Sequence, residues 1–253
     1  GFPHEFVAAR EQRSGYDHAV RASGARLVEV GFNEIVANAG VRRTEAWEYE
    51  AAFGPNTAGV FYSWWPTSRP ALEQVVEVAH RHDLPVLVDA AGELPPKAHL
   101  TALPATKADL IAFSGGKAIR GPQSTGILCG RHDLIGAAAL QMLDMDDHPE
   151  LWDPPPEFTD KRQFDGLPRH GIGRGLKVSK EEIVALLTAL ELFRSGAYDE
   201  QTVTFRKNLE TIVAELSSAA ARCEIIDKAD GESPPTLQIQ VEESTLKRTA
   251  LEL

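Results

Sequence analysis

The sequence contains few cysteines and no long apolar run. Cys129 and Cys223 are its only cysteines, and their spacing matches no zinc-binding pattern, so a reducing cytoplasm is the simplest compartment. Because Cys129 lies in the apolar run 126–130, we expect it to be a buried thiol. No run approaches the roughly 20 apolar residues of a membrane-spanning helix, and residues 1–5 lack the basic and apolar regions of a signal peptide. We therefore expect a cytoplasmic protein with no membrane partner.

Basic residues are also fewer than acidic residues. The chain has 26 lysines and arginines against 37 aspartates and glutamates, which gives a net charge of −11. Broad nucleic-acid binding relies on basic patches, so this balance disfavours a nucleic-acid partner. His80 and His82 are two residues apart and lie on different faces of a helix, so we expect no metal site there.

The rest of the composition is typical of a globular protein. The 253 residues are 43% apolar and 25% charged, enough for one large domain or two. Residue spacing predicts helices over 16–23, 44–52 and 72–79, with Trp47 facing inward, and strands over 26–30, 59–62 and 86–89. Alternating strands and helices indicate an α/β fold, a mostly parallel sheet covered by helices.

The last third of the chain has a different pattern. Residues 143–175 contain Pro154–Pro156 and several glycines, among them Gly166, Gly171 and Gly173, which predicts a long irregular loop. Ser179-Lys-Glu-Glu182 is a capping box and predicts the start of a helix. The expected inward face of this helix comprises Ile183, Leu186, Leu187, Leu190 and Phe193. A second helix is expected to follow, with Phe205, Leu209, Ile212, Val213 and Leu216 on its inward face. Strands are expected over 224–226 and 236–241. We predict a large domain over 1–178 and part of a smaller α+β domain over 179–253.

The most informative segment runs from Asp109 to Gly126. A strand-like apolar run ends in Ser114-Gly-Gly-Lys117, and a second turn, Gly-Pro-Gln-Ser-Thr-Gly, follows over 121–126. A lysine held between glycine-rich turns suits Schiff-base chemistry, while crowded backbone N–H groups and the Ser and Thr hydroxyls suit a phosphate. Together they indicate pyridoxal 5'-phosphate. A nucleotide P-loop is excluded because Ile111 and Ala118 stand where it needs glycine and Ser or Thr. A plain surface lysine remains the alternative.

A second candidate site lies at the end of the run 84–89. The run has no polar alternation, as in a strand buried on both faces, and it ends in Asp89. Ligands of open α/β sheets bind at this end of the strands. A carboxylate there pairs with the pyridine nitrogen of pyridoxal phosphate, and if the strands before Asp89 and Lys117 are neighbours, both side chains open into one crevice. The alternative is a helix N-cap role for Asp89.

Basic residues near these segments could hold anionic groups. Arg120 follows Lys117 by three residues and either binds an anion or is a solvated turn residue. Farther along, a glycine-rich stretch either binds a substrate carboxylate or phosphate or forms a mobile basic loop; its basic residues are Arg169, His170, Arg174 and Lys177.

These motifs resemble a known family. Val-Asp-Ala-Ala over 88–91 and Ser-Gly-Gly-Lys-Ala-Ile-Arg-Gly-Pro-Gln-Ser-Thr-Gly-Ile-Leu over 114–128 are similar to the selenocysteine synthase-like branch of class V, fold-type I PLP-dependent enzymes. Within that branch, they most resemble the D-glucosaminate-6-phosphate ammonia-lyase-like proteins. Segments 16–31 and 173–184 carry the same resemblance. One departure is Gly116, where many class V members have His before the lysine.

The resemblance implies roles for individual residues. Lys117 is expected to bind the cofactor and to act as acid and base at the substrate α-carbon, and Asp89 to pair with the pyridine nitrogen. The phosphate is expected to contact Ser114, Ser124 and Thr125. Either Arg13 or Tyr16 is expected over the cofactor ring. Arg174, inside a family-like motif, is the preferred substrate contact, with Arg120 as a second.

The resemblance also implies a reaction and an assembly. The expected activity is that of a lyase, which eliminates water and ammonia from a hydroxylated amino acid or amino-sugar acid to give a keto acid. Selenium transfer on seryl-tRNA, racemisation, aldol cleavage and transamination stay open. Because the 121–126 turn of such folds reaches the partner's cofactor, we expect a homodimer or larger homo-oligomer. Family members are longer, so we expect this chain to be a fragment without the N-terminal phosphate-binding turn.

Overall fold

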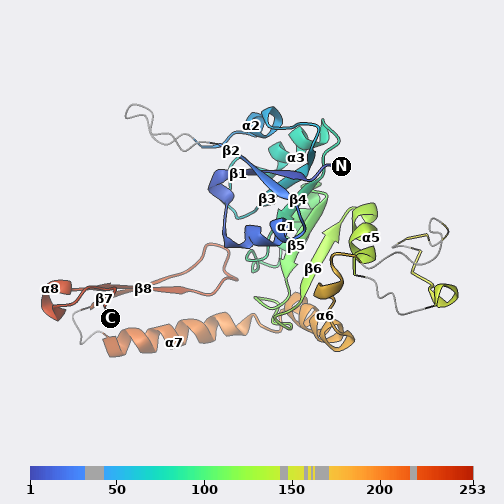
Figure 1. Cartoon of the computed structure of the whole chain (residues 1–253). Helices are drawn as coiled ribbons and strands as arrows, with labels where there is room; N and C mark the ends of the chain where they lie inside the picture. The colour runs from blue at the N-terminus through green and yellow to red at the C-terminus, as the bar shows by residue number, and fades with distance from the viewer. Residues whose placement is uncertain are drawn as a thin grey trace.

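A six-stranded sheet is the centre of the fold (Figure 1). The computed structural model describes residues 1–31, 43–142, 148–156, 159–160, 162, 171–216 and 221–252. The strand order is β2-β1-β3-β4-β5-β6, and all neighbours are parallel except β5 and β6. The strands are β1 Glu5–Ala9, β2 Arg26–Val30, β3 Thr57–Ser63, β4 Val86–Asp89, β5 Leu110–Ser114 and β6 Gly126–Gly130. The predicted α/β class with a mostly parallel sheet is confirmed.

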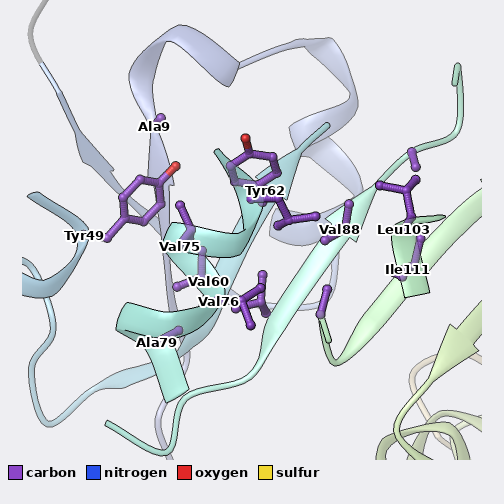
Figure 2. Packing of buried hydrophobic residues seen from close by; sticks show 14 of the residues in the cluster. Ala9, Tyr49, Val60, Tyr62, Val75, Val76, Ala79, Val88, Leu103 and Ile111 are labelled. Atoms are coloured by element: carbon purple, nitrogen blue, oxygen red, sulfur yellow. The ribbon is translucent and has the colours of Figure 1, made fainter. Parts of the chain in front are cut away.

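Helices cover the two faces of this sheet unequally. The main core lies between one face and α2 Ala46–Ala51, α3 Leu72–His80 and α4 His99–Ala105. Figure 2 shows its close packing around Val60, Val88 and Ile111, with Val75 of α3 against the strands. The opposite face carries a smaller cluster of Ala8, Val20 and Phe61, to which α1 His18–Ala22 contributes. Asp89 lies on this second face, because it follows the core residue Val88 and side chains alternate along a strand.

Tyr49 and Tyr62 place two phenol groups inside the main core. Neither side chain is exposed to solvent, and burial raises the pKa of both, that of Tyr62 to about 12. The Tyr62 hydroxyl donates to the carbonyl of Pro70 at 2.7 Å. Tyr49 also corrects one prediction: within α2 it faces the sheet, whereas Trp47 is 53% exposed and its indole donates to Glu45 at 2.6 Å.

A network of hydrogen bonds around Asp109 lies at the end of the sheet where β4 and β5 begin. This buried carboxylate accepts from the backbone of Val86 at 2.7 Å, from His80 at 2.9 Å and from Arg131 at 2.9 Å. It therefore ties α3, β4 and the start of α5 His132–Leu140 together. His82 pairs instead with Glu50 at 2.8 Å. No described cluster of His, Cys, Asp and Glu side chains could hold a metal ion.

The C-terminal part forms α6 Lys180–Ser195, α7 Glu200–Leu216 and a two-stranded antiparallel sheet, followed by α8 Glu243–Leu246. The two strands are β7 Ala221–Ile226 and β8 Thr236–Val241, and in Figure 1 they run beside α7, away from the large sheet. The predicted capping box is present: Ser179 Oγ accepts from the Glu182 N–H at 3.2 Å. No described helix combines the length and apolar character needed to cross a bilayer. The division at residue 178 stays a prediction.

The inward faces predicted for these two helices are only partly right. In α6, Phe193 and Ala189 are buried against Ile119, but Ile183 and Leu187 are exposed. No residue of α7 is buried. Cys129 is only half-buried, since β6 is an edge strand with one neighbour.

Candidate functional site

Three parallel strands end side by side at one edge of the large sheet. Ser63, the last residue of β3, pairs with Asp89, the last of β4, and Asp89 pairs with Ala112 of β5. Two residues beyond Ala112, Ser114 ends β5, and Lys117 follows in the next turn. The strands before Asp89 and Lys117 are therefore neighbours, as the sequence analysis required for a shared crevice.

A cavity of about 300 Å³ opens at this edge. Its volume lies at the lower end of the range for small-molecule sites. Asp89 and Lys117 both line it, and so do two other residues proposed from sequence, Arg13 and Tyr16. The fold thus brings four of the candidate residues together from three separate segments of the chain.

Lys117 is held by its turn. The Arg120 N–H donates to the Lys117 carbonyl at 3.0 Å, and the Gly121 N–H closes the turn by donating to Gly115 at 2.8 Å. The lysine amine faces Gly92, where an added Cβ would lie 3.8 Å from Nζ. It also lies 5.7 Å from the centre of the Tyr16 ring, within the range of a cation–π contact.

Gly116, where many class V members have His, lies in a tightly packed part of this turn. An added Cβ would come within 2.6 Å of the Gln123 Cα, which leaves no room for a side chain. Gln123 also donates from Nε2 to the Gly116 carbonyl at 2.9 Å. The glycine and the turn over 121–126 therefore depend on one another.

Asp89 caps a turn rather than a helix. Its Oδ1 accepts from the Ala91 N–H at 3.0 Å, in the loop that follows β4. The next helix, α4, begins only at His99. The N-cap alternative for Asp89 is therefore wrong, and the short turn holds its carboxylate at the sheet edge beside the cavity.

Arg13 is bound by two carboxylates. Its guanidinium donates to the buried Asp17 and to Glu29, and these contacts raise its pKa. Tyr16 is different: its ring is 74% exposed and lies toward Lys117. Of the two residues expected over the cofactor ring, Tyr16 is thus the one whose side chain meets the lysine amine.

Two of the three hydroxyls proposed for phosphate binding, those of Ser124 and Thr125, already have partners. Thr125 is buried and donates to the Pro122 carbonyl at 2.6 Å. Ser124 donates to the carboxylate of Glu182, the residue that also completes the cap of α6. A carboxylate at this position is an unfavourable neighbour for an anion, so phosphate binding by Ser124 would require this contact to open.

The proposed substrate arginines lie outside the Lys117 cavity. Arg120 lines a separate cavity of about 120 Å³ and lies 4.7 Å from the centre of the Tyr198 ring. Arg174 begins a short 3-10 turn, Arg174–Leu176, next to Gly173. Arg169 and His170 lie outside the described residues.

The cavity also contains residues that sequence reasoning missed, among them Gln12, Trp64 and Glu93. Trp64 follows β3 and could have been found by the strand-end rule applied to Asp89. Gln12 follows β1, a strand that was not predicted. Glu93 lies four residues after Asp89. Its pKa is raised, mainly by burial and also by the nearby charge of Asp89, while His99 and Lys117 act to lower it.

The cavity suits the aldehyde and ring of pyridoxal phosphate. It provides one amine for the aldehyde, one carboxylate for the pyridine nitrogen and the aromatic ring of Tyr16 beside the amine. Gly92 keeps the space in front of Lys117 Nζ free of a side chain. The residues present therefore fit the ring end of this cofactor.

Comparison with known proteins agrees with this fit. Residues 21–145 match the aminotransferase class-V family model. The chain is 27% identical to D-glucosaminate-6-phosphate ammonia lyase of Salmonella typhimurium, over 86% of this chain and 49% of that protein. It is 29% identical to 5'-C-glycyluridine monooxygenase-decarboxylase of a Streptomyces species, over 85% of this chain and 46% of that protein. It is 31% identical to L-seryl-tRNA(Sec) selenium transferase of Desulfovibrio desulfuricans, over 45% of this chain and 25% of that protein.

The fold is similar to that of solved structures as well. A structure of D-glucosaminate-6-phosphate ammonia-lyase superposes with a TM-score of 0.67 at 26% identity, over 96% of this chain and 56% of that one. The chain spans about half the length of the first two curated relatives. The sheet, the family match and these relatives together confirm the resemblance drawn from the sequence: the chain contains an aminotransferase class-V domain with the fold of type I enzymes, a group that uses pyridoxal 5'-phosphate.

Proposed function

We propose that the protein is a PLP-dependent lyase that removes water and ammonia from a hydroxylated amino acid or amino-sugar acid, similar to D-glucosaminate 6-phosphate, and yields a keto acid. The observation that carries this proposal is the meeting of Lys117 and Asp89 in one cavity at the ends of adjacent strands. Similarity to an ammonia lyase over most of the chain supports the choice of reaction.

Two side chains carry the main roles. The Lys117 amine would hold the cofactor covalently and would take the proton from the substrate α-carbon. The Asp89 carboxylate holds a proton at the pyridine nitrogen. When bound, pyridoxal 5'-phosphate supplies an electron-accepting ring that stabilises negative charge at the α-carbon.

Other residues would hold the cofactor and the substrate. Tyr16 is favoured over Arg13 for the ring contact, because Arg13 is bound by Asp17 and Glu29. The phosphate is assigned to Ser114, with Ser124 and Thr125 from the following turn. For the anionic end of the substrate we keep Arg174, with Arg120 as the second choice, although both lie outside the cavity of this chain.

A second candidate is selenium transfer on seryl-tRNA, since one relative is a selenium transferase. The net charge of −11 weighs against a transfer RNA partner. Racemase, aldolase and aminotransferase reactions use the same two residues and differ in the bond that is broken.

The proposal is tested by product analysis. The chain is incubated with pyridoxal phosphate and a panel containing D-glucosaminate 6-phosphate and both isomers of serine. A lyase releases ammonia and keto acid in equal amounts without an added amino acceptor. Amino transfer to an added keto acid without net ammonia would identify an aminotransferase instead. Tight, salt-sensitive binding of seryl-tRNA would identify the selenium transferase.

We also propose a homodimer or larger homo-oligomer. Three large apolar side chains on one face of α6 are exposed in the single chain, Ile183, Val184 and Leu187. Apolar faces of this kind commonly lie in protein interfaces. Sedimentation of the wild type against Leu187→Glu tests this proposal, which requires a smaller species for the variant. A reducing cytoplasm is proposed as the location, since both cysteines are free.

A further inference from the structure

Elimination of water needs a second proton carrier besides Lys117. Lys117 accepts the proton from the α-carbon, but a hydroxyl leaves the β-carbon readily only if it is protonated as the bond breaks. The group that supplies this proton must lie in the same cavity as Lys117 and must hold a proton near neutral pH.

Most titratable groups of the cavity are already engaged. Asp89 is assigned to the pyridine nitrogen. Arg13 is bound by two carboxylates. Glu11 accepts from the Thr44 N–H at 3.2 Å and lies 3.7 Å from Arg43. Two groups remain for the proton transfer, the Tyr16 phenol, which is largely exposed, and the Glu93 carboxyl, which is partly buried.

Glu93 has a rigid backbone. Its N–H donates to the Ala90 carbonyl at 3.1 Å, and its carbonyl accepts from the His99 ring at 2.6 Å. The His99 ring in turn packs edge-on against Trp64, with 4.8 Å between ring centres. The loop after β3 and the start of α4 thus hold Glu93 at the cavity.

The environment of the Glu93 carboxyl raises its pKa above that of an exposed glutamate. Partial burial raises its pKa most strongly, and the negative charge of Asp89 acts in the same direction. His99 and Lys117 act in the opposite direction, but burial prevails. A carboxyl that keeps its proton at higher pH is suited to donate it during a reaction near neutrality.

We propose that Glu93 is the general acid that protonates the leaving hydroxyl, an inference that rests on the proposed lyase function. Lys117 Nζ takes the α-proton, and the C–H electron pair forms the Cα=Cβ double bond. The Cβ–O bond breaks with its electron pair moving to oxygen, and the Glu93 proton completes a water molecule. The Glu93 carboxylate then regains a proton from solvent, and the Lys117 ammonium releases its proton to solvent, so both groups return to their starting states.

The test compares two leaving groups. Serine needs a proton for its hydroxyl to leave, whereas 3-chloroalanine loses chloride without one. Glu93→Gln should lower the keto-acid release from serine by about 100-fold or more and leave release from 3-chloroalanine within about 5-fold of wild type. Glu11→Gln, in the same cavity, is the matched control and should affect both substrates little.

Three outcomes would overturn the proposal. One is an equal loss with both substrates, which indicates a structural role for Glu93. Another is no loss with either. The third is a loss limited to serine in Tyr16→Phe instead, which assigns the proton to Tyr16.

A readout without turnover separates this inference from the proposed function. If the wild-type chain releases keto acid from none of the substrates, D-glucosaminate 6-phosphate included, the lyase proposal fails. Glu93 is then judged by a carbon-13 NMR titration of the cofactor-free chain, with Glu93→Gln to assign its carboxyl signal. A titration midpoint of Glu93 clearly above the ordinary range of a glutamate carboxyl is expected, and a midpoint within that range would overturn the general-acid role.

Discussion

The Lys117 amine lies 5.7 Å from the centre of the Tyr16 ring, and this contact joins the 3-10 turn Gly15–Asp17 to the glycine-rich turn after β5. Tyr16 also borders a second hollow of about 390 Å³ on the same sheet face, lined by apolar residues that include Phe61 and Leu87. The Tyr16 ring therefore lies at the boundary between a polar cavity and an apolar one.

This position predicts that the Tyr16 ring, rather than its hydroxyl, contributes to cofactor binding. Tyr16→Ala should weaken binding of pyridoxal phosphate by about 5- to 30-fold, since a ring contact is worth about 1–2 kcal/mol. Tyr16→Phe should bind almost as wild type. Fluorescence titration of the cofactor measures both, and equal weakening in the two variants would contradict the prediction.

Lys117 should be the single site of covalent attachment. Borohydride reduction of the cofactor-loaded chain, followed by peptide mapping, is expected to label Lys117 alone, and Lys117→Ala should give no label. Lys180→Ala, at an exposed lysine that begins α6, is the control and should label as wild type. A reducible adduct at wild-type yield in Lys117→Ala would show that another lysine carries the cofactor.

Asp89 should matter for turnover more than for binding. In Asp89→Asn the side chain can still accept from the Ala91 N–H, but it no longer holds a proton at the pyridine nitrogen. We expect kcat to fall by about 100-fold or more while most of the cofactor affinity is kept. Keto-acid release and cofactor titration measure the two quantities, and unchanged turnover would remove Asp89 from the mechanism.

The raised pKa of Glu93 predicts how stability depends on pH. The unfolded chain loses the Glu93 proton at lower pH than the folded chain, so the wild type loses stability as pH rises from the unfolded pKa to the folded one. Glu93→Gln lacks this loss. Its free energy of unfolding, relative to wild type, should therefore increase by up to about 1 kcal/mol between pH 4 and pH 7.5. Urea unfolding of the cofactor-free chain tests this, and a constant difference across that range would contradict it.

Asp109 should be important for stability and not for the site. Asp109→Asn leaves Arg131 and His80 without their buried anionic partner, and the loss of unfolding free energy should be about 2–4 kcal/mol. Asp133→Asn removes an exposed partner of the same Arg131 and should change stability little. Similar losses in both variants would show that the Asp109 network does not stabilise the fold.

The centre of the fold could be predicted from sequence because its signals are local. The strand 86–89 follows an apolar run, and α3 keeps its apolar residues at helical spacing. The position of Asp89 at the end of a buried strand was enough to mark it as a site residue. β1 escaped prediction because its sequence, Glu-Phe-Val-Ala-Ala, has only Phe6 and Val7 as strand-favouring residues. Gln12, which lines the cavity from the turn that follows β1, was therefore missed as well.

Other features depend on contacts that periodicity does not contain. Apolar spacing identified one face of α6, but Ile183 and Leu187 are exposed there, because nothing in the described chain covers them. In α2, the spacing indicated Trp47 as the inward residue, and only the position of the sheet decides that Tyr49 is inside instead. Glu93 has an ordinary sequence context, and its raised pKa follows from burial beside Asp89.

Leu186 of α6 packs directly on the lysine turn. An added Cβ would lie 2.7 Å from its Cδ1 at Gly115 and 3.0 Å from it at Gly121, so the two glycines bracket this one side chain. The predicted boundary at residues 178 and 179 is consequently a poor place to divide the protein. A large domain expressed without α6 would lose the support beneath Lys117, and a loss of cofactor binding in such a piece would say nothing about the chemistry of the lysine itself.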